Sequence, residues 1–377
     1  MNNVKSFFLE ILRIASAFYV FIFHIESFTI NNKTYFVNDN FLKSLRLNYY
    51  TAHNFVMIFF VLSGYLISIS ASKPNITFSK FIIARLGRLY SVVVPSLIFS
   101  FFVAFLLLGT TEIGHFITNT SNPFTRFGLN LIFLSQISTL CSTPPLNTPF
   151  WSVQYEFFYY LFLAVFLLVK KPYKYIFLLL LIVLSWPKIL LLLPVWLFGC
   201  FLYFYLEKIK VSLVFAILLF ASFFSVFCYF IVNPYSIPFQ NLRSDVTLCG
   251  YSLYFSWNYI SDYVFGISVM LTMFSFFMLS PYLNLLLENN KHFIYCFKKI
   301  KQIGNCTFTL YLFHLPLMFL ITTVLPYNKN SFIEILLLIF SVLFLVFVIA
   351  KYTEWKVIFW RNKVLDFFLL LKKFIIQ

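Results

Sequence analysis

The sequence predicts an all-α integral membrane protein, a helical bundle with about ten transmembrane helices and both termini in the cytoplasm. Of its 377 residues, 61% are hydrophobic and only 11% are charged, and the mean hydropathy is +0.89. A soluble domain of this size needs far more charged residues to cover its surface. Apolar runs recur along the whole chain, and each is long enough to cross ~30 Å of hydrocarbon as a helix.

Eight of these apolar runs are clear spans. They cover residues 7–25, 51–70, 90–108, 154–169, 211–232, 262–279, 308–324 and 332–350. The first run follows Lys5 as a secretion signal would, but it carries Glu10, Arg13 and His24, and no small-x-small cleavage pattern follows it. We therefore interpret it as a retained helix.

For two further regions, the apolar pattern alone does not decide whether or how often the chain crosses the membrane. Residues 127–137 are apolar over ~16 Å of helix, about half a bilayer, and are expected to be a re-entrant or interfacial piece. Residues 175–206 would form a helix of ~48 Å, too long for one simple span. Pro187 and Lys188 interrupt this stretch, which predicts either two short spans or one kinked span.

The positive charge decides between these topologies. If 127–137 does not cross and 175–206 crosses twice, the chain has ten spans, and 21 of its 28 Lys and Arg residues lie in the cytoplasm. A crossing at 127–137 would move Lys170, Lys171 and Lys174 outside and invert every later loop. The formal charge of +16 is therefore explained by topology, and no binding of nucleic acid is expected.

The domain organisation follows from the spans. Residues 1–350 are predicted to form one membrane-embedded domain, and 351–377 a short basic cytoplasmic tail along the inner leaflet. The six cysteines form no C-x-x-C pair, so no metal or redox site is expected. Cys141 and Cys249 both fall in predicted outer loops, where a disulfide between them is chemically allowed.

Arg13 and His24 are the first candidates for chemistry, because charged or titratable side chains inside spans are costly. They are eleven residues apart, so they share one helix face within ~20° and differ in depth by ~16 Å. This arrangement suits a long substrate with an anionic head and a reactive tip. The alternative is that Arg13 extends to lipid headgroups and His24 hydrogen-bonds in the outer interface.

Arg85 and Arg88 precede the third span on the cytoplasmic side. Positions i and i+3 share a helix face, so the two guanidinium groups are able to clamp a phosphate. The alternative is an ordinary positive anchor at the inner surface.

Glu156 begins a span at its outer end, at about the depth predicted for His24. A carboxylate beside a histidine orients the ring and raises its basicity. The alternatives are an acidic residue favoured by the helix dipole, and a belt of interfacial aromatic side chains around Trp151.

His314 is predicted near the middle of the membrane. A histidine there is either functional or bridges helices. The remaining histidines, His53, His115 and His292, lie in loops or at span ends and are assigned no role.

Taken together and in order, these segments resemble the acyltransferase family 3 membrane proteins, over residues 7 to 350. The stretch from Arg13 to His24 is similar to the family's R-x10-H segment, and Phe59 to Tyr65 is similar to its F-F-x-L-S-G-[FY] signature. Further similar segments are Arg85-x-x-Arg88, with Pro95 placed later than usual, Trp151-Ser152-x-x-x-Glu156-x-x-Tyr159, and Tyr311-Leu-Phe-His314-x-Pro316.

The resemblance implies a reaction. Members of this family move an acyl group, usually acetyl, from cytoplasmic acyl-CoA to a hydroxyl of a surface polysaccharide, lipopolysaccharide or lipid-linked glycan. His24 would then be the general base or a transient acyl carrier, assisted by Glu156. Arg13, Arg85 and Arg88 would hold acyl-CoA, which is a donor substrate and not a tightly bound cofactor.

The same resemblance assigns Trp151, Ser152, Tyr159, Tyr311 and His314 to a polar site with a substrate-binding or structural role. It places the protein in the cell's inner or plasma membrane as a multi-pass protein in contact with lipids, with a glycan as the acceptor.

Two other functions are compatible with a bundle of this size. One is a glycan transporter, but no internal repeat of the kind found in many transporters is visible. The other is a glycan polymerase, which is expected to expose a larger outer loop. The pairs Arg13 with His24 and Trp151 with Glu156 favour acyl transfer over both.

Overall fold

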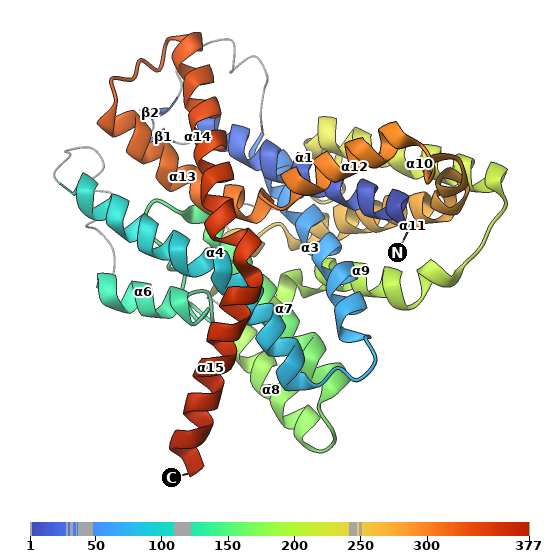
Figure 1. Ribbon diagram of the computed structural model, residues 1–377, viewed down its shortest axis with the longest axis horizontal. Helices are drawn as coiled ribbons and strands as arrows, with labels where there is room; N and C mark the ends of the chain where they lie inside the picture. Colours follow the sequence, from blue (N-terminus) through green and yellow to red (C-terminus); the bar gives the residue numbers. More distant parts are fainter. Residues whose placement is uncertain are drawn as a thin grey trace.

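The computed structural model describes residues 2–27, 29–30, 33–34, 36, 48–108, 122–240, 247–248 and 251–376, and its architecture is helical (Figure 1). The helices of the first half are α1 (Asn3–Ser27), α3 (Tyr49–Ala71), α4 (Phe78–Leu107), α6 (Pro123–Leu131), α7 (Trp151–Leu168), α8 (Tyr173–Ser185) and α9 (Lys188–Phe204). Those of the second half are α10 (Leu213–Val232), α11 (Tyr259–Leu287), α12 (Lys291–Gly304), α13 (Thr307–Val324), α14 (Phe332–Tyr352) and α15 (Val357–Ile376).

Short elements connect these helices. Two antiparallel hairpins pair β1 (Thr29–Ile30) with β2 (Lys33–Thr34) and β3 (Thr247–Leu248) with β4 (Tyr251–Ser252). Single 3₁₀ turns are η1 (Thr148–Phe150), η2 (Leu206–Lys208), η3 (Pro234–Ser236), η4 (Tyr254–Ser256) and η5 (Glu354–Lys356). The predicted all-α membrane bundle is confirmed. Cys249 and His115 lie outside the described residues, and the suggested pairing of Cys141 with Cys249 lies outside them too.

The number of candidate spans is close to the predicted number. In the described chain, eight helical stretches are long and apolar enough to cross a membrane, or nine if α8 and α9 together form one broken span. The sequence predicted two crossings over 175–206, but α8 and α9 are bent by 117° at Pro187. With 13 and 17 residues they measure ~20 and ~26 Å, so each is shorter than the ~30 Å hydrocarbon core. The described residues therefore give eight or nine candidate spans, roughly consistent with the predicted number of about ten, and the cytoplasmic location of both termini stays a prediction.

Two other predicted boundaries change. α4 begins at Phe78, capped by the Thr77 hydroxyl, so the helix starts twelve residues before the predicted span at 90 and includes Arg85 and Arg88. In the region predicted at 127–137, only 127–131 is α-helical, as the end of the nine-residue helix α6, which is too short to cross and so agrees with the expectation that this region does not cross.

A close crossing of α3 and α9 lies at the centre of the bundle. Gly64 of α3 and Gly199 of α9 face the partner backbone, and a Cβ atom built on either would lie 2.0 Å from a carbonyl oxygen of the other helix. Trp196, fully buried, sits one turn before Gly199 and donates its indole N–H to Ser63 at 3.1 Å. Gly64 therefore lets the backbones of α3 and α9 meet, and Ser63 places a hydroxyl group beside the crossing.

The C-terminal segment is helical and packs on the bundle, which the prediction of a short tail did not include. α14 and α15 follow one another through η5, and α15 crosses α4 (Figure 1). At the crossing, a Cβ atom on Gly87 would lie 2.7 Å from the Cα atom of Arg361. α15 therefore contacts the same turn of α4 that carries Arg85 and Arg88.

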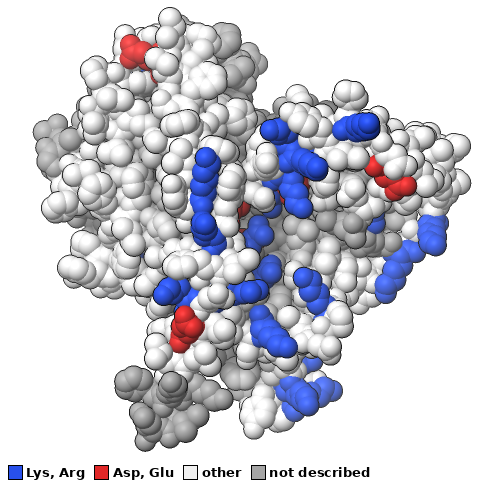
Figure 2. All heavy atoms as spheres, viewed as in Figure 1, with Lys and Arg blue, Asp and Glu red and all other residues white. Residues whose placement is uncertain are grey.

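Basic side chains form a band on the face drawn in Figure 2. Figure 2 shows Lys and Arg along a band through the middle and right of this face. α12 contributes four exposed lysines on an amphipathic helix: Lys291, Lys298, Lys299 and Lys301. The predicted placement of positive charge on the cytoplasmic side stays a prediction.

The α3–α9 crossing leads to the first prediction. Gly199→Ala should lower the melting temperature of the purified protein in detergent, because an added methyl group at a packed contact typically costs about 1–3 kcal/mol. The matched control is Gly128→Ala, where the added methyl group meets no atom within 4 Å. Equal melting temperatures for the two variants would contradict the close crossing.

Candidate functional site: two cavities that meet at Tyr311

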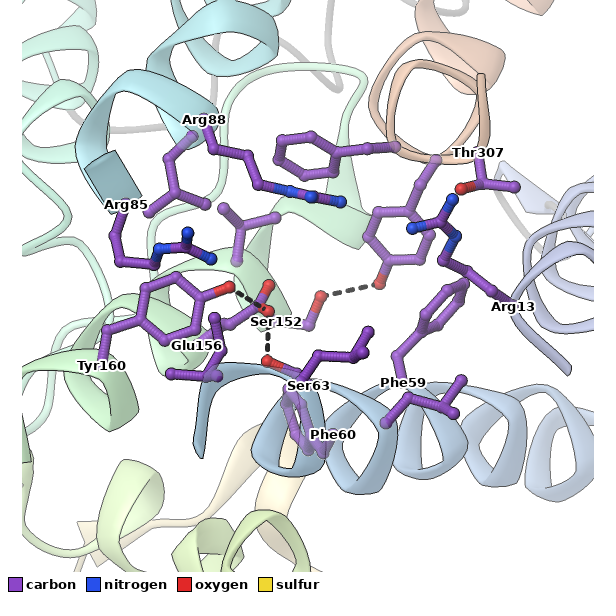
Figure 3. Close-up of a pocket in the computed structure, with 17 residues that line it drawn as sticks. Arg13, Phe59, Phe60, Ser63, Arg85, Arg88, Ser152, Glu156, Tyr160 and Thr307 are labelled. Carbon is purple, nitrogen blue, oxygen red and sulfur yellow. Dashed lines mark hydrogen bonds between the residues drawn. The ribbon is translucent and has the colours of Figure 1, made fainter. Parts of the chain in front are cut away.

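The first cavity, here called the arginine cavity, lies among α1, α3, α4, α7 and α13 and has a volume of about 130 Å³. Arg13, Arg85 and Arg88 approach it from different sides, around Glu156 (Figure 3). Phenylalanine, leucine and isoleucine side chains complete much of its wall. Three cations therefore share an otherwise mainly apolar space with one carboxylate.

Glu156 is already engaged by hydroxyl groups. Ser63 donates to its Oε1 atom at 2.5 Å, and Tyr160 donates to the same oxygen. By contrast, Arg85 and Arg88 make no hydrogen bond or ion pair to the described part of the chain, and the Nε atom of Arg85 is buried. The Arg85 guanidinium lies over the ring of Phe81, 5.8 Å from its centroid. The cavity thus has an excess of positive charge whose donors are available to an anionic ligand.

Arg13 is held from two sides. Its Nη2 atom donates to the carbonyl oxygen of Gly304 at 2.6 Å and lies 2.6 Å from Glu10 Oε2. A Cβ atom on Gly304 would lie 2.0 Å from that carboxylate oxygen and 2.9 Å from Nη2. Glycine at 304 is therefore what allows Arg13 to reach the end of α12.

The start of the C-terminal segment fixes the same turn. Glu354, buried, accepts hydrogen bonds from the backbone N–H and the hydroxyl of Thr309, at 3.1 and 3.2 Å. Trp355 donates its indole N–H to the carbonyl oxygen of Asn305 at 3.1 Å. η5 thus clamps the α12–α13 connection, which supplies Gly304 to Arg13 and Thr307 to the cavity wall.

The second cavity, here called the histidine cavity, has a volume of about 230 Å³ and is lined by His24, His53 and Trp151. The Nδ1 atom of His24 lies 2.7 Å from the carbonyl oxygen of Val20. A carbonyl oxygen only accepts, so Nδ1 carries the proton and Nε2 keeps its lone pair in the neutral ring. His24 is therefore prepared to act as a base or a nucleophile through Nε2.

Tyr311 belongs to the walls of both cavities. Its hydroxyl lies 2.8 Å from the hydroxyl of Ser152, and its ring packs edge-on against Phe59 with centroids 5.7 Å apart. Tyr311 is therefore the residue that the walls of the two cavities share.

The other predicted residues separate into two groups. Trp151 lines the histidine cavity and Ser152 the arginine cavity. Tyr159 and His314 line neither: Tyr159 donates to the carbonyl oxygen of Ile189 at 2.9 Å, which ties α7 to α9. His314 is buried against His24, with ring centroids 5.1 Å apart, and its Nε2 atom has no hydrogen-bond partner within the described ranges.

The structure does not bring Glu156 to His24. The expectation that they meet rested on similar depth, but Glu156 points into the arginine cavity while His24 faces the histidine cavity. Trp151, which lines the histidine cavity, and Glu156 are five residues apart on α7, or ~140° apart around the helix. Glu156 therefore faces away from the cavity that holds His24.

A second polar pair was missed by the sequence analysis. His53 and Asp262 lie 3.1 Å apart, both buried, and His53 lines the histidine cavity. His53 lies at the start of the predicted span 51–70 and Asp262 is the first residue of the predicted span 262–279. Titratable residues in spans are candidates by default, so applying that rule to span ends as well was a signal for them. Among the described residues, no group of three or more His, Cys, Asp or Glu gathers in a way that would hold a metal ion.

The contact at Gly304 gives a prediction for the arginine cavity. Gly304→Ala should displace Arg13 and weaken pyrophosphate binding about tenfold, which corresponds to ~1.4 kcal/mol. The measurement is the pyrophosphate-dependent rise in melting temperature in detergent, with Gly128→Ala as the matched control. Undiminished binding by Gly304→Ala would exclude Arg13 from the anion site.

Comparison with known proteins identifies the fold family. A family model described as an acyltransferase domain, Acyl_transf_3, matches residues 6–351, nearly the whole chain. None of the curated proteins and none of the solved structures with which the chain was compared matches it. Every residue that lines the two cavities lies within the match, whereas η5 and α15 lie beyond it. The chain therefore belongs to the Acyl_transf_3 family of acyltransferases and is a multi-pass membrane protein of that family.

Proposed function

We propose that this protein is a membrane O-acyltransferase that moves an acyl group, most simply acetyl, from cytoplasmic acyl-CoA to a sugar hydroxyl of a surface polysaccharide or lipid-linked glycan. The observation that carries the proposal is the pair of cavities, one cationic and one with histidines, that share Tyr311 as a wall. The cell's inner or plasma membrane is the proposed location.

The arginine cavity supports an acyl-CoA donor. Arg85 and Arg88 have no ion-pair partner within the described chain, and the one carboxylate in the wall, Glu156, is held by two hydroxyl groups. Guanidinium groups bind phosphate oxygens through paired N–H donors. A polyphosphate such as the pyrophosphate of CoA supplies the missing negative charge, and the flexible pantetheine arm has the reach to approach Tyr311.

The histidine cavity supports an acceptor hydroxyl. It is lined by aromatic rings and by the open Nε2 atom of His24. Two roles of His24 fit this geometry: a base that takes the hydroxyl proton, or a nucleophile that carries the acyl group. Either role places the reacting carbonyl beside Tyr311.

The first test compares the O-acyl signals of surface glycans by NMR in cells with the wild type, with His24→Ala or with no protein. We expect signals with the wild type and a loss of at least about 10²-fold in transfer with His24→Ala, since general-base catalysis is typically worth ~10²–10⁴. Western blotting of membranes controls for the amount of protein.

Two outcomes would contradict the proposal. Identical glycans in cells with the wild type and in cells without the protein would remove the proposed function. Signals that persist with His24→Ala would remove the role of His24 alone.

Tyr311 gives a separate prediction. Tyr311→Ala should join the two cavities and let water reach the thioester, so hydrolysis of acyl-CoA without acceptor should rise relative to transfer. Tyr311→Phe is the matched control, because it keeps the ring and loses only the contact with Ser152. The measurement is thiol release from acetyl-CoA by purified protein, and an Ala variant that hydrolyses no faster than the Phe variant would argue against Tyr311 as the barrier.

A further inference from the structure

His53 and Asp262 form a buried pair in the wall of the histidine cavity that the function proposed above does not use. The Nε2 atom of His53 lies 3.1 Å from Asp262 Oδ2, and the two side chains are 5% and 0% exposed. Asp262 lies in the first turn of α11, where the helix dipole favours a negative charge. A carboxylate this deeply buried is retained at great cost unless it has a partner, and its ion-pair partner here is a histidine.

The ring of His53 is fixed in a column of aromatic side chains. The Tyr49 ring lies roughly parallel to it, with centroids 6.1 Å apart and an angle of 19°, and the Trp151 ring is also roughly parallel to it, at 6.0 Å and 13°. Trp151 stacks in turn on Phe255 at 4.7 Å and 4°. All four side chains line the histidine cavity. Aromatic rings thus pack beside the imidazole, and its hydrogen bonds are made in the plane of the ring, through Nδ1 and Nε2.

The two edges of the ring have different surroundings. An ionised carboxylate only accepts hydrogen bonds, so Nε2 carries a proton toward Asp262 and Nδ1 keeps the lone pair in the neutral ring. In the described part of the chain, Nδ1 has no hydrogen-bond partner, and it is not among the atoms buried without one. It is therefore open to the cavity that His53 lines.

His24 differs from His53 in what stabilises a positive charge. The Nδ1 atom of His24 donates to a backbone carbonyl, and the neighbouring ring is that of another histidine, His314, with centroids 5.1 Å apart. Neither group carries a negative charge. His53 has a carboxylate instead. In an apolar cavity, an adjacent carboxylate stabilises the positively charged form that a histidine takes when it accepts a proton.

We propose that His53 is a catalytic residue that takes the proton of the acceptor hydroxyl through Nδ1, and that Asp262 is its positioning residue. This rests on the acyl-transfer function proposed above. The hydroxyl oxygen forms a bond to the acyl carbon while its proton moves to Nδ1 of His53. The carbon–sulfur bond then breaks, the electron pair stays on the sulfur of CoA, and the proton on His53 is returned to that thiolate. The products are the ester and CoA with a free thiol, and His24 remains available to contact the acyl group.

The decisive variant is His53→Gln. The amide nitrogen of glutamine reaches the position of Nε2 and keeps a hydrogen bond to Asp262, whereas no acceptor remains at the position of Nδ1. A merely structural His53 should tolerate this change. The proposal expects transfer to fall by about 10²-fold or more, within the range of general-base catalysis.

The assay uses purified full-length protein, radiolabelled acetyl-CoA, and the surface polysaccharide of the expressing cells after mild alkali has removed its esters. Equilibrium binding of CoA is measured on the same samples. His53→Gln should bind CoA as the wild type does, whereas Arg88→Gln should lose CoA affinity. Asp262→Asn, similar in shape, should lower kcat with little change in KM for the polysaccharide, and Asp262→Glu should restore part of the rate.

A second measurement needs no variant. Diethylpyrocarbonate modifies accessible histidine nitrogens, and mass spectrometry reports each site. The same polysaccharide should slow modification of His53, whereas His292, exposed on α12, is the internal control and should react equally with and without it.

The outcomes are distinguishable. Transfer by His53→Gln at the wild-type rate, or modification of His53 unaffected by the polysaccharide, would overturn the role of His53 and leave the proposed function intact. Absence of transfer by the wild type would overturn the proposed function and this inference together. If His53→Gln does not fold, as judged by CoA binding, the protection experiment decides alone.

Discussion

Three guanidinium groups inside an apolar bundle are the constraint on which the rest of this structure depends. Removing such groups from water is expensive, and the described chain compensates only part of the cost, through Glu10 and the carbonyl of Gly304 at Arg13. Arg85 and Arg88 keep their donors unused. Guanidinium groups that are buried without a partner destabilise the fold, and an anion bound between them would offset that cost.

The packing explains how the prepared site stays open. Ser63 and Tyr160 hold Glu156, which keeps the carboxylate from closing onto the arginines. Trp196 holds Ser63 in turn, and Trp196 is placed by the close backbone crossing at Gly64 and Gly199. A chain of contacts therefore runs from two glycines in the centre of the bundle to the charge balance of the cavity.

The sequence was sufficient for features that depend on helix geometry alone. The fixed rise of a helix separates Arg13 from His24 by depth, and the structure places them at different cavities accordingly. Contacts between segments far apart in the chain could not be predicted from the sequence. His53 pairs with Asp262 across 209 positions and Arg13 with Gly304 across 291, and no local periodicity reports such separations. The double crossing at 175–206 failed for a related reason, because length and charge do not show how sharply a chain bends at a proline.

The contact between Gly87 and Arg361 has a consequence for how this family diverges. Gly87 stands between the two arginines of the Arg85-Leu-Gly-Arg88 segment, and the backbone of α15 occupies the space that a side chain there would need. α15 lies beyond the region that matches the family. Relatives without such a C-terminal helix are released from this restriction, so the two positions should covary: small at 87 where the helix is retained, and unconstrained in size where it has been lost.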